Sequence, residues 1–562
     1  MNPRTPTIFP PIRVCAVVAL CGIANGAQTE PAKTAATGQM PPAEVQQKIF
    51  IREIRVAGTQ TLSRIEVEEA VYPFLGPGRT FSDVEGARAA LEKVYHDKGY
   101  KATQVVIPEQ TGGGGLVLLQ ALEGKVGSLR VKGAKYFLPS RIKQMARSMA
   151  EGKVLNFNDV TRDIVALNKT ADRRVEPKLT PSGDPGVFDI DLNVKDTLPL
   201  HGRVELNDRR SPNTTDLRVN TSLSYANLWQ LGHTVGGSMQ ISPENQSEVK
   251  VFSGFYIWRF ADPDWLSVLV SYTKQNSNVS TLGGSAVLGK GEILGVRGIA
   301  TLPGAENFFH SFSAGFDYKH FNQTLNTGTV SDVTPIWYFP ISMSWDGTWI
   351  HKKHDAEKNE DAVRGTTEMS MGVTANVRGI GSPAAKLDRN RYGSDGNFFV
   401  FHGEVSHTEK LRRDWEAFLK IHGQAADQPL VNSEQVAGGG MSTVRGYIEA
   451  EAVGDNGIFG TAELRTPSLL REIKVKTNPS DPDERTGDEW RFYGFLDAGA
   501  ITLHQVLPQQ ISSYRLASFG LGTELQWRKN FHAIAELALP LTHVGETSVH
   551  EARVNFRLWA DF

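Results

Sequence analysis

The decisive stretch of this sequence is its last ten residues, Arg553-Val-Asn-Phe-Arg-Leu-Trp-Ala-Asp-Phe562. Every even-numbered position is apolar, whereas arginine, asparagine, tryptophan and aspartate occupy the odd-numbered positions. Successive side chains of a β-strand point to opposite faces, so the apolar groups would share one face. Arg557 and Asp561 would lie on the other face, a contrast typical of a strand between lipid and a water-filled lumen. The segment therefore predicts a transmembrane β-barrel.

The same alternation runs through residues 198–562, in short stretches separated by Gly, Asn, Asp and Pro. Two further apolar faces are Phe399, Phe401, Gly403 and Val405, and Phe531, Ala533, Ala535, Leu537 and Leu539. The region holds 365 residues. Divided among sixteen antiparallel strands this gives about 23 residues each, more than the ~9–11 that cross a bilayer. A large soluble β-sandwich also alternates, so the pattern alone leaves that alternative open.

The composition restricts the class of protein. Hydrophobic residues make up 40% of the chain and the mean hydropathy is −0.29. A membrane barrel has such a low average because its lumen-facing residues are polar. After the N-terminal segment, no apolar run reaches the roughly 18 residues of a membrane-spanning helix. The formal charge of −2 gives no sign of a nucleic-acid partner. A membrane location would therefore require a closed sheet.

Residues 1–27 have the pattern of a signal peptide. Arg4 and Arg13 supply positive charge, Val14 to Ile23 form a short apolar core, and Ala24-Asn25-Gly26-Ala27 offers small residues for cleavage. The segment predicts export from a bacterial cytoplasm.

Both cysteines, Cys15 and Cys21, lie inside that predicted signal peptide. We therefore expect the mature chain to contain no disulfide and to use no thiolate chemistry. Residues 28–48 are rich in Pro, Ala and Thr and are predicted to form an N-terminal tether.

Residues 49–124 and 125–197 form two stretches with one shared order of elements, strand-helix-helix-strand-strand. In the first, the predicted strands are Ile49–Val56, Ala102–Ile107 and Leu116–Leu122, and the helices are Leu62–Phe74 and Phe81–His96. In the second, the strands are Val126–Val131, Val175–Leu179 and Phe188–Val194, and the helices are Pro139–Ala150 and Asn158–Asn168. Ser82 and Glu85 are expected to cap the helix that begins near Phe81. The shared order predicts two α+β domains related as a repeat.

Two segments of the barrel region carry unusual side-chain combinations. The first is Gly438-Gly-Gly-Met-Ser-Thr-Val-Arg-Gly-Tyr447, in which glycines allow sharp turns around Arg445. The second is Phe492-Tyr-Gly-Phe-Leu-Asp-Ala-Gly499, a strand that places Asp497 opposite Leu496 and Ala498. On the residues alone, a solvated loop arginine and an unrelated lumen aspartate remain an alternative reading.

These segments resemble the two signature motifs of the Omp85 superfamily. Val444, Arg445, Gly446 and Tyr447 match the VRGY tip of its sixth extracellular loop, and Phe495, Asp497 and Gly499 match its inner-wall F-x-D-x-G strand. Within the superfamily, the chain is similar to the two-partner-secretion transporters, the haemolysin and adhesin secretion proteins. The resemblance implies that the loop folds back into the lumen and that Arg445 pairs with Asp497.

Further residues support this resemblance along the chain. The first α+β unit resembles a polypeptide-transport-associated (POTRA) domain through Gly58-Thr59, Gly99-Tyr100, Val106 to Gln110 and Glu123-Gly124. The second resembles such a domain through Leu167-Asn168 and the stretch from Gly183-Asp184 through Leu192 to Pro199. The terminal Phe562 resembles the aromatic residue by which the barrel-assembly machinery recognises its clients. The implied fold is a barrel of sixteen strands over 198–562, preceded by two periplasmic POTRA domains.

The implied function is a pore in the outer membrane of a Gram-negative bacterium, embedded in its lipid. It would recognise an unfolded adhesin- or haemolysin-like exoprotein through the POTRA domains and pass it to the cell surface. An Omp85-type assembly factor that inserts other barrels is the alternative, although such relatives usually carry more POTRA units. A passive porin is a third reading. About 20 residues precede Ile49 after the cleavage site, so a pore-plugging helix with a linker has little room.

The sequence predicts no enzyme, cofactor or metal. Gly284 to Gly291 nearly matches a phosphate-binding loop, but Gly291 replaces the Ser or Thr that would hold magnesium, and no helix is expected to follow. His351 and His354 lie in a charged stretch without a cluster of further ligands. The charged segments His351–Arg364 and Lys474–Glu489 are expected to be long surface loops.

Overall fold

The computed structural model describes residues 48–110, 113–282, 287–327, 330–355, 360–470 and 488–562. The chain divides into two compact units that meet in the sequence between Pro199 and Leu200, and each is described by itself. The predicted signal peptide and tether, residues 1–48, lie outside the described residues apart from Lys48. No helix in the described part of the chain is both long enough and apolar enough to cross a membrane.

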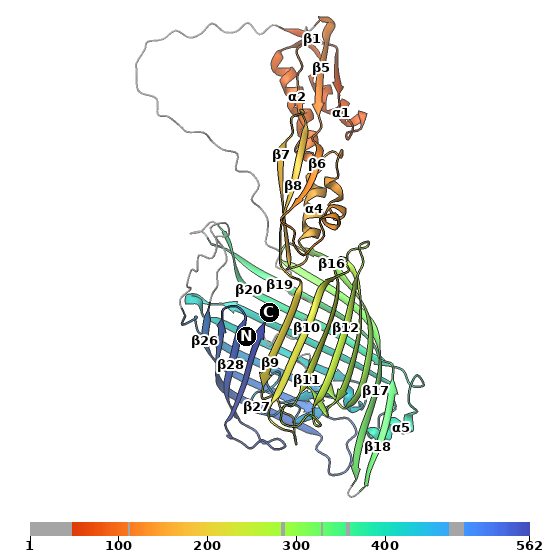
Figure 1. Ribbon diagram of the computed structural model, residues 1–562, viewed down its shortest axis with the longest axis vertical. Helices are drawn as coiled ribbons and strands as arrows, with labels where there is room; N and C mark the ends of the chain where they lie inside the picture. The colour runs from red at the N-terminus through yellow and green to blue at the C-terminus, as the bar shows by residue number, and fades with distance from the viewer. Residues whose placement is uncertain (1–47, 111–112, 283–286, 328–329, 356–359, 471–487) are drawn as a thin grey trace. The chain divides into compact units, whose positions relative to one another are not determined.

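The unit that begins at Leu200 is a closed antiparallel β-barrel with sixteen strand positions (Figure 1). It starts with β9 (Leu200–Asn207) and closes when β29 (Arg553–Asp561) pairs back onto β9. The remaining strands are β10 (Arg218–Leu228), β11 (His233–Ile241), β12 (Lys250–Arg259), β13 (Leu266–Asn276), β16 (Lys290–Ala305), β17 (Phe308–Thr327), β18 (Val330–Tyr338), β19 (Ile341–Asp355), β20 (Glu360–Asn376), β21 (Phe398–Lys410), β22 (Glu416–Ala426), β25 (Asn456–Arg465), β26 (Glu489–Thr502), β27 (Ser513–Trp527) and β28 (Phe531–Pro540). Closure leaves no free sheet edge, as a lipid environment requires.

One strand position is made of two segments. β18 pairs with the C-terminal half of β17, and β19 pairs with its N-terminal half. Only Phe339 and Pro340 separate the two segments, and proline cannot donate a hydrogen bond to a strand ladder. β18 and β19 therefore fill a single place in the barrel, and the predicted sixteen antiparallel strands are confirmed.

The alternating pattern that predicted the barrel corresponds to its two faces. In β29, Val554 is 64% exposed and Leu558 46%, whereas Asn555 on the opposite face is only 3% exposed. Phe399 and Phe401 of β21 are likewise exposed on the outer face. In the absence of lipid, exposed apolar side chains in this alternating pattern indicate a surface that hydrocarbon covers.

The closing seam between β9 and β29 is short. Its register pairs Arg203–Asn207 with Asp561–Arg557, five residue pairs, whereas every other ladder between neighbouring barrel strands in the described residues has at least eight. Two ion pairs cross it, Arg203 with Asp561 at 2.6 Å and Arg557 with Glu205 at 2.8 Å. We call the rim where β9 begins and β29 ends the near rim, and the opposite rim the far rim.

The unit before Leu200 contains two successive α/β parts. In the first, β2 (Glu53–Ala57) lies parallel to β5 (Leu116–Leu122), which pairs antiparallel with β4 (Gln104–Val106). A short pair, β1 (Ile49–Ile51) and β3 (Gly76–Arg79), completes its strands. The helices are α1 (Arg64–Val71), continued by a 3₁₀ turn to Phe74, and α2 (Phe81–Asp97). Val84, Ala87, Leu91 and Tyr95 of α2 are buried, as the helical spacing predicts.

The second part repeats this topology. β6 (Lys125–Lys132) lies parallel to β8 (Val187–Asp196), and β8 pairs antiparallel with β7 (Arg173–Pro181). Its helices are α3 (Pro139–Met145) and α4 (Phe157–Leu167). A separate buried apolar cluster, which includes Ile142, Leu155, Leu167 and Ile190, forms its core.

Two local predictions were wrong. The N-terminal cap of α2 is Thr80 with Asp83, and not Ser82 with Glu85, because Thr80 is the last extended residue and Ser82 already lies in the first turn. The stretch His351–Arg364 is not a long loop, because its described residues belong to β19 and β20. Strands that extend past the hydrocarbon layer can carry such charges in water. The expected loop Lys474–Glu489 lies outside the described residues up to 487.

Candidate functional site

The candidate site is the long connection between β22 and β25, residues 427–455, which we call loop 6. Two short strands, β23 (Val436–Gly438) and β24 (Ala452–Gly454), pair to form its neck. At the tip, Gly439, Gly440 and Gly446 all have φ angles near +90 to +102°. Side-chain-bearing residues rarely adopt this backbone conformation, so the glycines permit the compact turn that presents Arg445.

Arg445 makes a two-pronged ion pair with Asp497 of β26. Its Nε lies 2.7 Å from Asp497 Oδ2, and its Nη2 lies 2.8 Å from Oδ1. The backbone N–H of Arg445 donates to the same carboxylate at 3.1 Å. Such parallel hydrogen bonds fix the guanidinium plane as well as its position.

Two further carboxylates surround the guanidinium. Arg445 Nη1 lies 2.7 Å from Glu463 of β25 and 3.0 Å from Glu536 of β28. The guanidinium carbon also lies 3.6 Å from the centre of the Phe495 ring, a cation–π contact. The tip of loop 6 is therefore bound to three strands of the barrel wall at once.

The neighbourhood balances part of this negative charge. Arg465 donates to Glu463 at 2.5 Å, and the Tyr493 hydroxyl donates to Glu536 at 2.7 Å. Arg445 is 5% exposed and Asp497 3%, so the pair is screened from water. Removing one partner of such a buried pair leaves an uncompensated charge and costs much more than removal at a surface site.

The other residues of the two motifs pack around the pair. Val444 and Tyr447 belong to a buried apolar cluster with Phe459 and Ile501. The Tyr447 hydroxyl donates to the Thr542 carbonyl at 2.8 Å. Gly499 leaves the space that this cluster needs, because a Cβ there would lie 2.4 Å from the Phe459 ring.

The structure thus brings together seven of the residues singled out from the sequence: Val444, Arg445, Gly446, Tyr447, Phe495, Asp497 and Gly499. Phe562 lies elsewhere, on the seam, where its backbone exchanges hydrogen bonds with Gly202 at 2.9 and 3.0 Å. A Cβ at Gly202 would collide with the Phe562 ring, so the ring packs directly over the first strand.

Sequence reasoning missed Glu463, Arg465 and Tyr493 as parts of the site. Each lies on the lumen face of a strand, but nothing local in the sequence distinguishes it from other lumen residues. Glu536 lies between the apolar residues Ala535 and Leu537, so the alternation predicts its face but not its partner. Only the curvature of a closed barrel brings the four together.

The metal and phosphate alternatives receive no support from the site. The described residues contain no group of three or more side chains able to hold a metal ion. His351 Nε2 contacts the Thr367 hydroxyl at 2.7 Å, and the side chain of His354 lies outside the described part of the chain. The segment Gly284–Gly291 lies partly outside the described residues, and its described remainder enters strands.

Two family models match this chain. The model for the ShlB-type POTRA domain matches residues 49–124, and that for the haemolysin secretion/activation protein ShlB/FhaC/HecB matches residues 353–525, which contain loop 6 together with Glu463 and Asp497. The chain is 25% identical to the outer membrane transporter CdiB of Escherichia coli O6:K15:H31 over 177 residues, which are 32% of this chain. That match spans 30% of the relative's length.

Longer matches cover most of the chain. The outer membrane transporter CdiB of Dickeya dadantii is 20% identical over 453 residues, which are 74% of this chain and 72% of the relative. The solved structure of CdiB from Escherichia coli superposes with a TM-score of 0.60 at 18% identity, covering 94% of this chain and 93% of that one. Together these matches support a two-partner-secretion transporter of the Omp85 superfamily, similar to the haemolysin secretion/activation proteins.

Proposed function

We propose that this protein is an outer-membrane pore that receives an unfolded partner exoprotein on its periplasmic α/β region and passes it to the cell surface. The observation that carries the proposal is the arginine-tipped loop bound inside a closed barrel, in a chain whose first domain is of the ShlB POTRA type. The barrel lies in the outer membrane of a Gram-negative bacterium, with POTRA in the periplasm.

We further propose that residues 125–197 are a second POTRA domain. Gly58 has φ +84° and a Cβ there would lie 2.3 Å from the Ala121 carbonyl oxygen. Gly133 has φ +85° and a Cβ there would lie 2.5 Å from the Val194 carbonyl oxygen. The same close approach of a turn to the last strand occurs once in each part.

A carboxylate two residues after each of those carbonyls supports the same conclusion. Glu123 accepts hydrogen bonds from the backbone N–H groups of Gln60 and Thr61 at 2.7 and 2.9 Å. Asp196 accepts from the N–H groups of residues 135 to 137 at 2.8–3.0 Å. Both carboxylates therefore tie down the turn that follows the first parallel strand, and this shared device supports a repeated domain with boundaries 49–124 and 125–197.

The exoprotein is proposed to dock on an open sheet edge. In the second part, the nine-residue β7 pairs with β8, and no strand of the described residues pairs with its other side. An extended segment can add to such an edge through backbone hydrogen bonds with little demand on sequence. Pro177 and the charged Arg174 and Lys178 would limit addition of unrelated chains.

The remaining partners follow from this assignment. The client would be an adhesin- or haemolysin-like exoprotein, the outer face would contact lipid, and Phe562 would serve as the signal for the barrel-assembly machinery. Residues 1–27 and 28–48 are proposed to be signal peptide and tether, and 198–562 the barrel. With no nucleotide, cofactor or metal assigned, folding of the client outside the cell is the proposed driving force.

The test is a secretion assay with Arg445→Ala. The variant is expected to insert into the outer membrane as the wild type does, but to release little of the partner exoprotein into the medium. Arg297→Ala is the matched control, because Arg297 pairs with Asp317 at 2.8 Å on another part of the barrel. Equal secretion by the Arg445 variant and the wild type would refute the role given to loop 6.

The alternative function, insertion of other outer-membrane barrels, predicts a different result. Deletion of the gene would then lower the amounts of many outer-membrane proteins, and would not act on one secreted protein alone. Quantitative comparison of the outer-membrane and medium proteins of the deletion strain separates the two functions.

A further inference from the structure

The seam of the barrel ends before its last strand does. β9 stops at Asn207, which pairs with Arg557, while β29 begins four residues earlier in the chain, at Arg553. At this point the backbone N–H of Phe556 donates to the side chain of Asp208 at 2.9 Å, in place of a strand partner. The far-rim end of the seam is therefore not closed by a backbone ladder to β9.

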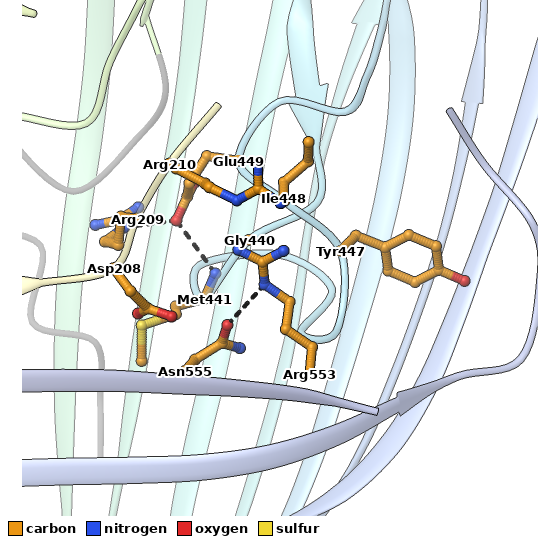
Figure 2. Close-up of a pocket in the computed structure, with 10 residues that line it drawn as sticks. All are labelled: Asp208, Arg209, Arg210, Gly440, Met441, Tyr447, Ile448, Glu449, Arg553 and Asn555. Carbon is orange, nitrogen blue, oxygen red and sulfur yellow. Dashed lines mark hydrogen bonds and ion pairs between the residues drawn. The ribbon is translucent and has the colours of Figure 1, made fainter. Parts of the chain in front are cut away.

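Loop 6 reaches this same place (Figure 2). Arg209 Nε lies 2.6 Å from Glu449 Oε1, and the two side chains are 6% and 2% exposed. The backbone N–H of Glu449 donates to the Arg210 carbonyl at 2.9 Å. The loop is thus joined to the residues that directly follow β9, by a buried ion pair and a backbone hydrogen bond.

Other residues of loop 6 surround the Glu449 carboxylate and fix its position. Gly440 has φ +93°, and a Cβ there would lie 2.2 Å from the Glu449 carboxyl carbon. The Met441 N–H donates to Glu449 at 3.3 Å. The cavity that these residues line with Arg553 and Asn555 of β29 is only about 10 Å³ in volume, so the site is a packed joint without room for a ligand.

We infer that Arg209 and Glu449 are positioning residues that hold loop 6 against the far-rim end of the seam, so that docking of the loop and closure of the seam depend on each other. The Arg445 anchor attaches the loop to β25, β26 and β28, and the Arg209–Glu449 anchor attaches it to the chain beyond β9. Loop 6 therefore spans β29 from both sides. Withdrawal of the loop removes this carboxylate from Arg209 and leaves the seam with its short ladder and the two ion pairs that cross it.

The test measures seam closure directly in the full-length chain in outer membranes. Cysteines replace Leu206 and Leu558, which face each other in the β9–β29 register. A control pair replaces Val405 and Ile421, which face each other between β21 and β22. Because residues 28–562 contain no cysteine, each disulfide forms between the introduced residues only. The rate of disulfide formation is compared among wild type, Glu449→Gln and Arg209→Gln.

We expect both substitutions to slow the seam disulfide on the order of tenfold, the effect of losing one hydrogen bond between charged groups, and to leave the control disulfide unchanged. The double variant should be no slower than either single variant, since both remove the same bond. Gly440→Ala should slow formation of the seam disulfide as well, because the added methyl group displaces Glu449 while the carboxylate keeps its charge. If either of the other two variants fails to assemble, Gly440→Ala serves in its place.

Two results would overturn the inference. An unchanged seam rate would show that closure does not need the anchor. Equal slowing of the seam and control pairs would show only a general loss of barrel stability. Neither result depends on a secreted client, so the proposed secretion function stands or falls separately.

Discussion

Arg445 is held by more carboxylates than one guanidinium neutralises. Asp497, Glu463 and Glu536 all lie within 3.0 Å of its nitrogens. Burial of such a cluster stabilises the fold little, because desolvation offsets much of the attraction, but it makes one loop position far better than its neighbours. The residue therefore specifies where the loop sits.

Arg445→Lys separates charge from geometry. Lysine keeps the positive charge but presents a single ammonium in place of a planar fork, so it cannot satisfy Asp497 through two parallel hydrogen bonds while reaching Glu463. We expect secretion between that of wild type and Arg445→Ala, measured as exoprotein in the medium per assembled barrel. Full secretion by the lysine variant would show that charge alone holds the loop.

Glu123 has a comparable role in the first α/β part. It is 6% exposed and also accepts a hydrogen bond from the buried Tyr95 hydroxyl at 3.1 Å, and burial together with this carboxylate raises the pKa of Tyr95. Glu123→Ala would leave several buried donors unsatisfied and should destabilise this part by about 2–4 kcal/mol. Hydrogen exchange at residues 60 and 61 is the measurement.

The control for that experiment is Glu53→Ala. Glu53 is exposed and pairs with Arg55 on the surface at 2.9 Å, an arrangement worth about 0–1 kcal/mol. The assignment of Glu123 as the residue that holds this turn would be contradicted by either of two results. One is faster exchange at residues 60 and 61 in the Glu53 variant, and the other is an unchanged exchange rate in the Glu123 variant.

At the scale of elements, α1 carries a prediction about pH. Ser63 caps the helix and Glu66 returns the hydrogen bond, while the Lys98 ammonium and the Ser63 groups lower the pKa of Glu66 to about 2. A lowered pKa in the folded state means that the stabilisation is present above the ordinary pKa of about 4.3 and is lost as the pH falls toward 2.

Glu66→Gln should therefore speed hydrogen exchange in residues 64–71 at pH 7. The difference from wild type should shrink as the pH falls from about 4 to 2, because the wild-type carboxylate is then protonated too. The exchange rates are corrected for intrinsic chemistry at each pH, and a difference that stayed constant over this range would exclude a contribution from the Glu66 charge.

The helices and strands were largely predictable from the sequence. Period-two alternation located β21, β28 and β29, and helical spacing located α2, because burial of one face spaces the apolar residues at regular intervals in the sequence. The cap of α2 was misplaced since Thr80-x-x-Asp83 and Ser82-x-x-Glu85 both fit the pattern, and only backbone geometry separates them. The prediction of a loop at His351 was wrong because a run of charged residues does not distinguish a loop from a strand that extends into water.

The candidate site divides in the same way. Arg445 and Asp497 stand in motifs that the resemblance made recognisable. Glu463, Arg465 and Glu449 could not be identified, because their roles arise from closure of the sheet and from the path of loop 6, which no local pattern records.

At the scale of the whole molecule, insertion of the barrel and secretion of the exoprotein should depend on different parts of the chain. Deletion of residues 49–124 should leave the barrel able to insert, since this part has a buried core of its own, but should abolish secretion. Heat-modifiable migration in gels reports the folded barrel, and the medium reports secretion. Secretion at the wild-type level by the deletion variant would show that the POTRA domain of residues 49–124 is not needed to receive the client.

The length of β17 has a consequence outside the cell. Residues 323–327 extend past the last pairing with β16 and pair only with β18, so this hairpin continues about 17 Å farther than its neighbour at 3.3 Å per residue. It lies at the far rim, opposite the rim at which the chain enters the barrel at Leu200. An antibody or a bacteriophage approaching the bacterium would meet this projection early, which makes it a favourable place for an inserted epitope tag and for immune recognition.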